Sequence, residues 1–250
     1  MAMPDPLQTY YDNYRLSHTA EGYGEFYDKL YEAGYFLAMW REVEKPVIEN
    51  ILRPLGGPGR TCLDFACGTG RITELDAGFF GSVLGVDVSE PMLAQTRQSE
   101  HVRFRRIDLT RETLDETFDV VTAMRFFLNA EEPLHGEALR AIHARLKPDG
   151  RLVCNIHMNA FSPAGIGYHL INLLPGKRTR HTMSAGEFRR RLEAANFAVD
   201  QIVCYGFMPG PRILPAKVSA PLVKPVEKLA HALRLPGLIA QNFIAVARKR

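Results

Sequence analysis

The sequence predicts an α/β protein with a doubly wound, seven-stranded and mostly parallel sheet. The first observation is the stretch from Cys62 to Leu75, where an apolar run passes through Gly68 and Gly70 into a helical pattern, as in a strand, a tight turn and a helix. The second is an apolar run ending in Asp87, roughly 20 residues further on. The third is the near-continuous apolar segment Phe118–Met124, which is typical of a central parallel strand.

Length and composition indicate one globular domain. The chain has 250 residues, with a hydrophobic content of 46% and a charged fraction of 24%. We expect a single domain in three parts: a helical cap over 1–55, a core over 56–158 that contains the glycine turn, and insertions with the closing strands over 159–250. The four cysteines form no C-x-x-C pair, and the pattern predicts no metal site and no disulfide framework.

The helical cap begins near Gly24, after a polar, tyrosine-rich segment over 1–23 that we expect to be a loose arm. Its apolar residues recur at helical spacings, which places them on one face: Phe36, Trp40, Val43, Val47 and Ile51. Pro46 interrupts or restarts this helix, because a proline ring does not fit unstrained into a helix interior.

Strands and helices alternate through the core. The helix after the glycine turn is expected to be short, since Gly78 and Gly81 close it within about two turns of Arg71. Ser89 caps the following helix, with Pro91 in its first turn, where the missing N–H is no loss. The other core elements are expected to be strands over Ser82–Val88, Val102–Ile107, Phe118–Met124 and Arg151–Met158 and a helix over Glu137–Leu146.

The last part of the chain contains two segments without clear periodicity, 159–183 and the proline-rich 208–240. We expect both to be irregular connections, which in compact domains are often functional. Ser184 opens a capping box before a helix over Phe188–Ala195. Phe197–Tyr205 and Asn242–Ala247 are expected to be the final strands, joined by a non-helical connection.

Two kinds of nucleotide cofactor suit a glycine turn, because residues without a Cβ let a ligand lie against the backbone. A dinucleotide needs a third glycine beside its pyrophosphate, and Thr73 holds that place. Asp64, just before the glycines, would repel a pyrophosphate but attract an ammonium group such as that of S-adenosylmethionine. Asp87 follows where such folds place an acid for ribose hydroxyls. An ordinary corner without a ligand is the remaining alternative.

The segment Asp64-Phe65-Ala66-Cys67-Gly68-Thr69-Gly70 resembles the Asp-x-x-Cys-Gly-x-Gly hallmark of the class I S-adenosylmethionine-dependent methyltransferases, in particular those acting on small molecules. Gly85–Ser89 with Pro91-Met92-Leu93, and the turn over Leu146–Leu152, resemble further blocks of the family. The resemblance spans about residues 55–205 by motif. It implies a Rossmann-like fold with an antiparallel last strand, S-adenosylmethionine as cofactor and S-adenosylhomocysteine as product.

The resemblance also implies a set of cofactor-binding residues at the carboxyl ends of the strands. It assigns Asp108 to the adenine amine and Met92 to the wall of the adenine ring. It implies that residues 10–53 fold over the cofactor, with Tyr23, Tyr27 or Tyr31 over the sulfonium. The expected cofactor-binding residues are Asp64, Ala66, Gly68, Thr69, Gly70, Asp87, Val88, Met92, Asp108, Leu109 and Met124.

The acceptor is less closely defined by the sequence. His157, at the end of the fifth predicted strand, is the best-placed general base for a hydroxyl acceptor, with a structural histidine as the alternative. Residues 176–250 hold fourteen Lys and Arg against four acids, which indicates either an anionic partner or solvated helix faces. We expect O-methylation of a small or medium-sized organic molecule, anionic or lipid-like, such as a natural product, sugar or lipid-like intermediate. Further substrate candidates are Arg125, Asn129, Asn159, Arg178, Arg180 and His181.

Two other interpretations come from different functional classes. One is a nicotinamide-dependent oxidoreductase, which Asp64 and Thr73 disfavour, and the other is a cofactor-binding module without methyl-transfer activity. The sequence has no recognisable nucleic-acid-reading module, so we expect no sequence-specific nucleic-acid partner. It shows neither a basic and apolar leader nor about 18 uninterrupted apolar residues, and we expect a cytoplasmic protein without a transmembrane segment.

Overall fold

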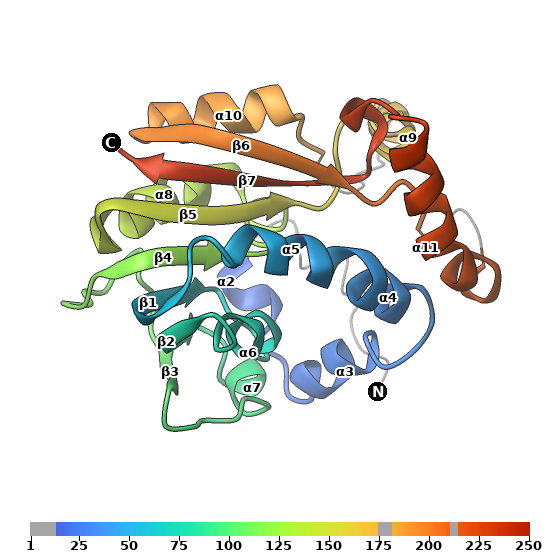
Figure 1. Cartoon of the computed structure of the whole chain (residues 1–250). Helices are drawn as coiled ribbons and strands as arrows, with labels where there is room; N and C mark the ends of the chain where they lie inside the picture. The colour runs from blue at the N-terminus through green and yellow to red at the C-terminus, as the bar shows by residue number, and fades with distance from the viewer. Residues whose placement is uncertain (1–13, 175–181, 211–214) are drawn as a thin grey trace.

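The computed structural model describes residues 14–174, 182–210 and 215–250. Over these residues the strands form one seven-stranded sheet in the order β3-β2-β1-β4-β5-β7-β6 (Figure 1). The strands are β1 (Gly57–Phe65), β2 (Phe80–Asp87), β3 (Val102–Arg106), β4 (Phe118–Ala123), β5 (Leu146–Ile156), β6 (Phe197–Tyr205) and β7 (Asn242–Lys249).

The direction of the strands confirms the predicted fold class. Neighbouring strands from β3 to β5 are parallel, and β7 runs antiparallel to both β5 and β6, between which it lies. The strand order reverses between β1 and β4, since the chain proceeds outward through β2 and β3 on one side and through β5 on the other. The loops after β1 and β4 therefore leave from adjacent strand ends, where ligands of such sheets collect.

Two helical layers cover the sheet because side chains of a strand alternate between its faces. Leu63 belongs to the core that also holds residues of α8 (Glu132–Arg145) and α10 (Ala185–Ala194). Its neighbour Cys62 belongs to the opposite core, under α5 (Lys45–Leu52) and α6 (Arg71–Asp76). Figure 1 shows α5 in front of the sheet and α8 behind it.

The predicted cap is formed by α3 (Tyr23–Lys29), α4 (Gly34–Met39) and α5, with a π-helical turn, η1 (Trp40–Glu44), between α4 and α5. Pro46 lies in the first turn of α5. Pro46 has no N–H to donate to the preceding turn. The chain forms a wider π-turn just before this position, and the helix continues past the proline. The predicted apolar stripe packs on the sheet, with Val43 and Ile51 buried and the other three partly buried. The division of the chain at residues 55 and 158 stays a prediction.

The short helices agree with their predicted start signals. α6 ends at Asp76, as expected from the glycines that follow it. α7 (Glu90–Leu93) is capped by Ser89, whose Oγ accepts a hydrogen bond from the Met92 N–H at 3.4 Å. Ser184 caps α10 in the same way, with the Glu187 N–H as donor at 3.2 Å. Gly81, however, lies within β2 and takes no part in ending α6.

The expectation of an irregular segment over 159–183 is wrong in part. Residues Pro163–Asn172 form α9, capped by Ser162, whose Oγ accepts from the Gly165 N–H at 3.0 Å. The segment 1–23 also contains a helical turn in its described portion, α2 (Tyr14–Ser17). The predicted helix over 137–146 begins earlier, at Glu132, with a proline in its first turn.

The connection between β6 and β7 is helical, which contradicts the prediction for 208–240. It contains α11 (Ala216–Ala232) and a short 3₁₀ helix, η2 (Gly237–Ile239), although α11 includes Pro221 and Pro225. The helix α11 packs against α4 (Figure 1), and its buried residues recur at helical spacing: Ser219, Val223, Glu227 and Ala230. Burial of this face stabilises α11 by more than the two prolines destabilise it. The prediction from the sequence pattern gave the prolines too much weight.

Among the described helices, none is both long enough and apolar enough to cross a membrane.

Gly81 gives a direct test of the packing between β1 and β2. A Cβ at this position would lie 1.8 Å from the carbonyl oxygen of Pro58, a backbone atom that has little room to move. We therefore expect Gly81→Ala to lower the free energy of unfolding by about 1–3 kcal/mol in urea denaturation. Gly59→Ala is the matched control, since nothing lies within 4 Å of its Cβ position. Equal stability of the two variants would contradict the packing described here.

Candidate functional site

The turn between β1 and α6 has a backbone that requires glycine. Gly68 and Gly70 have φ angles of 58° and 86°, in the left-handed region. A Cβ on Gly68 would approach Met92 Cε to 3.0 Å, and one on Gly70 would approach the Phe104 ring to 2.9 Å. The turn is therefore pressed closely against α7 and β3, and its exposed backbone forms one wall of a cavity.

Asp87 ties this turn to the end of β2. Its carboxylate accepts hydrogen bonds from the Gly68 N–H and the Ser89 N–H, each at 2.8 Å. Burial raises the pKa of Asp87, while the hydrogen bonds from Ser89 and Gly68 oppose this effect. Because each carboxylate oxygen has a second lone pair, Asp87 keeps acceptor capacity toward a ligand in the cavity.

Asp64 lies at the base of the same turn and is buried. Its carboxylate accepts from Thr73 Oγ1 at 2.7 Å and from Thr122 Oγ1 at 3.3 Å. Thr122 Oγ1 also lies 2.7 Å from the carboxylate of Asp76, so one hydroxyl joins two buried acids. Burial raises the pKa of Asp64 to about 7 and raises that of Asp76 well above its usual range. A cation beside Asp64 would relieve this desolvation.

Two adjoining cavities lie at the carboxyl ends of the strands, and they share a wall. The first contains the glycine turn and the second lies between β2, the Asp108 loop and Phe126; Tyr14, Arg15, Ala66, Asp87 and Val88 line both. The first is also lined by the predicted residues Asp64, Gly68, Thr69, Met92, Met124, Arg125 and Asn129. Asp108 and Leu109 line the second. Gly70 lines neither and shapes the turn.

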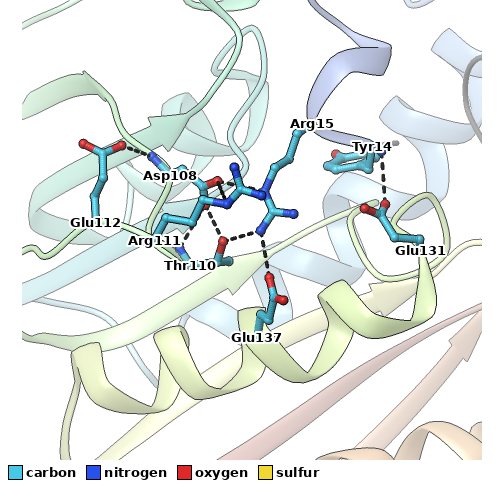
Figure 2. Close-up of polar contacts among 8 residues, drawn as sticks. All are labelled: Tyr14, Arg15, Asp108, Thr110, Arg111, Glu112, Glu131 and Glu137. Atoms are coloured by element: carbon cyan, nitrogen blue, oxygen red, sulfur yellow. Dashed lines mark hydrogen bonds and ion pairs between the residues drawn. The ribbon is translucent and has the colours of Figure 1, made fainter. Parts of the chain in front are cut away.

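An N-terminal turn closes the second cavity. Figure 2 shows Arg15 of α2 reaching Asp108, Thr110 and Glu137, at 2.8 Å, 2.5 Å and 2.8 Å. The Tyr14 N–H also donates to Glu131 at 3.0 Å. Burial opposes the charge of Asp108, but hydrogen bonds from Thr110 and Arg15 hold the pKa of this carboxyl below its usual value. Any ligand that binds Asp108 shares it with Arg15.

Other predicted site residues lie outside these cavities. His157 follows β5 and is buried, but it does not line either cavity. The Asn159 amide is used in the chain's own structure, because its nitrogen donates to the carbonyls of Leu238 and Ala240 at 2.8 Å and 3.0 Å. Arg178, Arg180 and His181 lie outside the described residues. Of the three candidate tyrosines over the sulfonium, Tyr27 lines the first cavity.

Sequence reasoning missed several residues of the site. Tyr14, Arg15 and His18 line the first cavity, yet they come from a segment without periodicity or motif. Asp76 was missed because its position in α6 looks like an ordinary helix residue, although it is fully buried. The sequence did contain a signal for Asp76. Because α6 follows the glycine turn directly, the face of this helix that packs on the sheet can be located, and Asp76 is a polar residue on that buried face.

The comparison with protein families concerns this part of the chain. Residues 62–150 match the family model described as a methyltransferase domain. These residues contain the end of β1, the glycine turn, β2 with Asp87, β3 and β4, and thus most of the residues that line the first cavity. Residues 62–150 form a methyltransferase domain.

Curated relatives cover the methyltransferase domain and little beyond it. The cypemycin N-terminal methyltransferase of a Streptomyces species is 42% identical over 103 residues, or 39% of this chain and 41% of the relative. A ubiquinone biosynthesis O-methyltransferase of Pseudomonas syringae pv. tomato is 33% identical over 129 residues, or 47% of this chain and 54% of the relative. The chain therefore spans about half the length of the curated relatives it matches.

Solved structures share the fold over most of the chain. Magnesium protoporphyrin IX methyltransferase from Synechocystis PCC 6803, with bound S-adenosylhomocysteine, superposes with a TM-score of 0.61 at 14% identity, over 90% of this chain and 94% of that one. The [4+2]-cyclase SpnF superposes with a TM-score of 0.58 at 22% identity, over 87% and 84%. At these identities the likeness concerns the fold, and the second case is named for a reaction other than methyl transfer.

The buried acid Asp76 makes stability of the methyltransferase domain depend on pH. Folding raises the pKa of Asp76, so protonation of this carboxyl favours the folded state. The stabilisation is fully present below pH 3.8, the usual pKa of the group, and is lost as the pH rises through the folded-state pKa. We expect the stability that Asp76→Asn gains over wild type to be larger at pH 8 than at pH 5, growing by up to about 1.4 kcal/mol per pH unit below the folded-state pKa of Asp76. Urea denaturation at both pH values measures the gap, with the exposed Asp115→Asn as control. A gap that is constant with pH would contradict the burial of an ionisable Asp76.

Proposed function

We propose that this protein is an S-adenosylmethionine-dependent methyltransferase that acts on a small or medium-sized organic acceptor. The observation that carries the proposal is the Asp87 carboxylate, bonded to the Gly68 N–H at 2.8 Å and lining a cavity that also contains the buried Asp64. The methyltransferase domain over residues 62–150 supports the same assignment. The proposal extends this assignment to the whole chain.

The residues present fit the cofactor better than they fit a dinucleotide. Asp64 faces the cavity with a carboxylate that an ammonium group would compensate and a pyrophosphate would not. Asp87 has acceptor capacity for ribose hydroxyls, and the second cavity offers apolar walls from Val88, Leu109 and Phe126 for a flat ring. S-adenosylmethionine supplies a methyl group already activated on a sulfonium, and the expected product is S-adenosylhomocysteine. The protein's own task is then to orient the acceptor.

We propose a hydroxyl as the acceptor group. The curated relatives are compatible with either nitrogen or oxygen as the methyl-accepting atom, since one is named an N-terminal methyltransferase and the other an O-methyltransferase. A hydroxyl must lose its proton as its oxygen bonds to the methyl carbon, so it needs a base. The assignment of His157 to this role stays a prediction. His18 lines the cavity, and burial lowers its pKa to about 4, so its imidazole is uncharged at neutral pH.

The acceptor is expected to carry an anionic group or a lipid-like body, but four apolar residues of the segments 159–183 and 208–240 do not line the first cavity. Phe161, Ile166 and Leu170 are exposed, and Val223 is in the core of α11 and α4. The described residues that line the cavity offer cationic groups instead, from Arg71 and Arg125. These observations favour an anionic acceptor over a purely apolar one.

The cofactor assignment predicts the effect of removing the Asp87 carboxylate. We expect Asp87→Ala to weaken binding of S-adenosylhomocysteine by about 1–3 kcal/mol, because charge-assisted hydrogen bonds to the ribose and the support of the Gly68 N–H are both lost. Isothermal titration calorimetry measures the affinity, and circular dichroism checks that the variant is folded. Asp115→Ala, which removes an exposed acid, is expected to bind like wild type. Unchanged affinity in folded Asp87→Ala would reject the assignment.

The choice of a hydroxyl acceptor is tested with labelled S-adenosylmethionine. We expect transfer of the labelled methyl group to 3,4-dihydroxybenzoate, a hydroxyl probe that carries a carboxylate, and none to a peptide with a free N-terminal amine. With the hydroxyl probe, His157→Ala is predicted to lose about 10²–10⁴ in turnover while its affinity for S-adenosylhomocysteine stays intact. Wild-type turnover of this variant at neutral pH would make His157 structural, and label on the peptide alone would replace O-methylation by N-methylation.

A further inference from the structure

Two arginines from different strand ends meet at the side of the first cavity away from Asp108. Arg71 begins α6 directly after the glycine turn, and Arg125 follows Met124 at the end of β4. Both line the cavity, and their guanidinium carbons lie 3.5 Å and 5.5 Å from the centroid of the same Tyr31 ring. Arg71 also lies 4.5 Å from the centroid of the Trp40 ring. The cap thus holds two cations at the cavity through the aromatic faces of Tyr31, in the turn after α3, and Trp40, in η1.

The nearby acid is already fully used. Glu44 is buried and binds Arg125 Nη2 through Oε2 at 2.9 Å, while its Oε1 accepts the hydroxyl of Tyr205 at 2.9 Å. Arg71 makes no ion pair with any residue that the structure describes. The group formed by Arg71, Arg125 and Glu44 therefore carries one positive charge without a partner among the residues that the structure describes.

The hydrogen-bond inventory leads to the same conclusion. Nε and Nη1 of Arg71 are inaccessible to solvent and have no acceptor among the described residues. Buried donors of a charged group are costly when unpaired, and native proteins pair nearly all of them. The field of the two cations also acts on Tyr31: burial would raise the pKa of this phenol, but Arg125 and Arg71 lower it below its usual value.

We propose that Arg71 and Arg125 form a binding site for a carboxylate within the cavity. A guanidinium fork matches the two oxygens of a carboxylate, and a monoanion balances the single unpaired charge, whereas a dianionic phosphate would leave negative charge in excess. This inference rests on the proposed function, under which the carboxylate has two possible sources. One is the amino-acid end of the cofactor, and the other is an acid group on the acceptor. Both supply the same chemistry to Arg71.

The test compares Arg71→Met with wild type, with Arg53→Met as control. Arg53 is an exposed arginine that also lies over an aromatic ring, 5.9 Å from the Phe79 centroid, and it does not line the cavity. The full chain is titrated by calorimetry with three probes: S-adenosylhomocysteine, its decarboxylated analogue S-adenosyl-3-thiopropylamine, and benzoate. Circular dichroism establishes that each variant is folded.

If the cofactor supplies the carboxylate, Arg71→Met weakens S-adenosylhomocysteine by about tenfold to a hundredfold and leaves the decarboxylated analogue unchanged. If the acceptor supplies the carboxylate, wild type and Arg71→Met bind S-adenosylhomocysteine equally. Benzoate then binds wild type that is saturated with S-adenosylhomocysteine but does not bind Arg71→Met in the same state. Either result supports the site, provided that Arg53→Met resembles wild type. The proposal is overturned if neither S-adenosylhomocysteine nor benzoate distinguishes Arg71→Met from wild type. A wild type that binds no S-adenosylhomocysteine would instead refute the proposed function, and benzoate titration of the unloaded chain would still test the carboxylate site.

Discussion

The hydrogen bond from the Gly68 N–H to the Asp87 carboxylate, 2.8 Å long, is the contact on which the rest of the site depends. It joins the turn after β1 to the end of the neighbouring strand β2, while the second oxygen of Asp87 holds the Ser89 N–H that begins α7. The turn can make this contact because Gly68 and Gly70 adopt positive φ angles and leave room for Met92 and Phe104. The carboxyl ends of the parallel strands thereby become a wall of exposed backbone and carboxylate oxygens, the surface that a polar nucleoside ligand needs.

Residues far apart in the chain complete the site around this wall. Arg15 of α2 binds Asp108 and Glu137 on one side, and Tyr31 and Trp40 of the cap hold Arg71 on the other. The cap is itself supported from the C-terminal part, where α11 packs on α4 and Glu227 accepts the Gly206 and Phe207 N–H groups after β6. Nε and Nη1 of Arg71, unpaired within the described part of the chain, lie inside this enclosure, which is a reason to place ligand recognition there.

The sequence was sufficient wherever a local pattern determines the structure. The strand over Phe197–Tyr205 has the predicted bounds, and the glycine turn, the Ser89 and Ser184 caps and the antiparallel last strand were all predicted. Prediction failed where tertiary burial overrides local preference, as for Pro221 and Pro225 inside α11. It failed also where a side chain acts through a distant partner: Arg15, separated by 93 residues from Asp108, gives no periodic signal. Arg125 was anticipated as a substrate residue, but the pairing of Tyr31 with Arg71 depends on how the cap folds over β1 and β4.

The central claim is that the cavity beside Asp64 and Asp87 accepts an ammonium-bearing nucleoside and excludes a pyrophosphate. Calorimetric titration of the same preparation of the full chain with S-adenosylhomocysteine and with NADH tests it most directly. The account predicts saturable one-to-one binding of S-adenosylhomocysteine and no binding of NADH at the same concentrations, because a buried carboxylate at the turn repels the pyrophosphate. Saturable binding of NADH that competes with S-adenosylhomocysteine, or binding of NADH without any binding of S-adenosylhomocysteine, would contradict the account and favour an oxidoreductase.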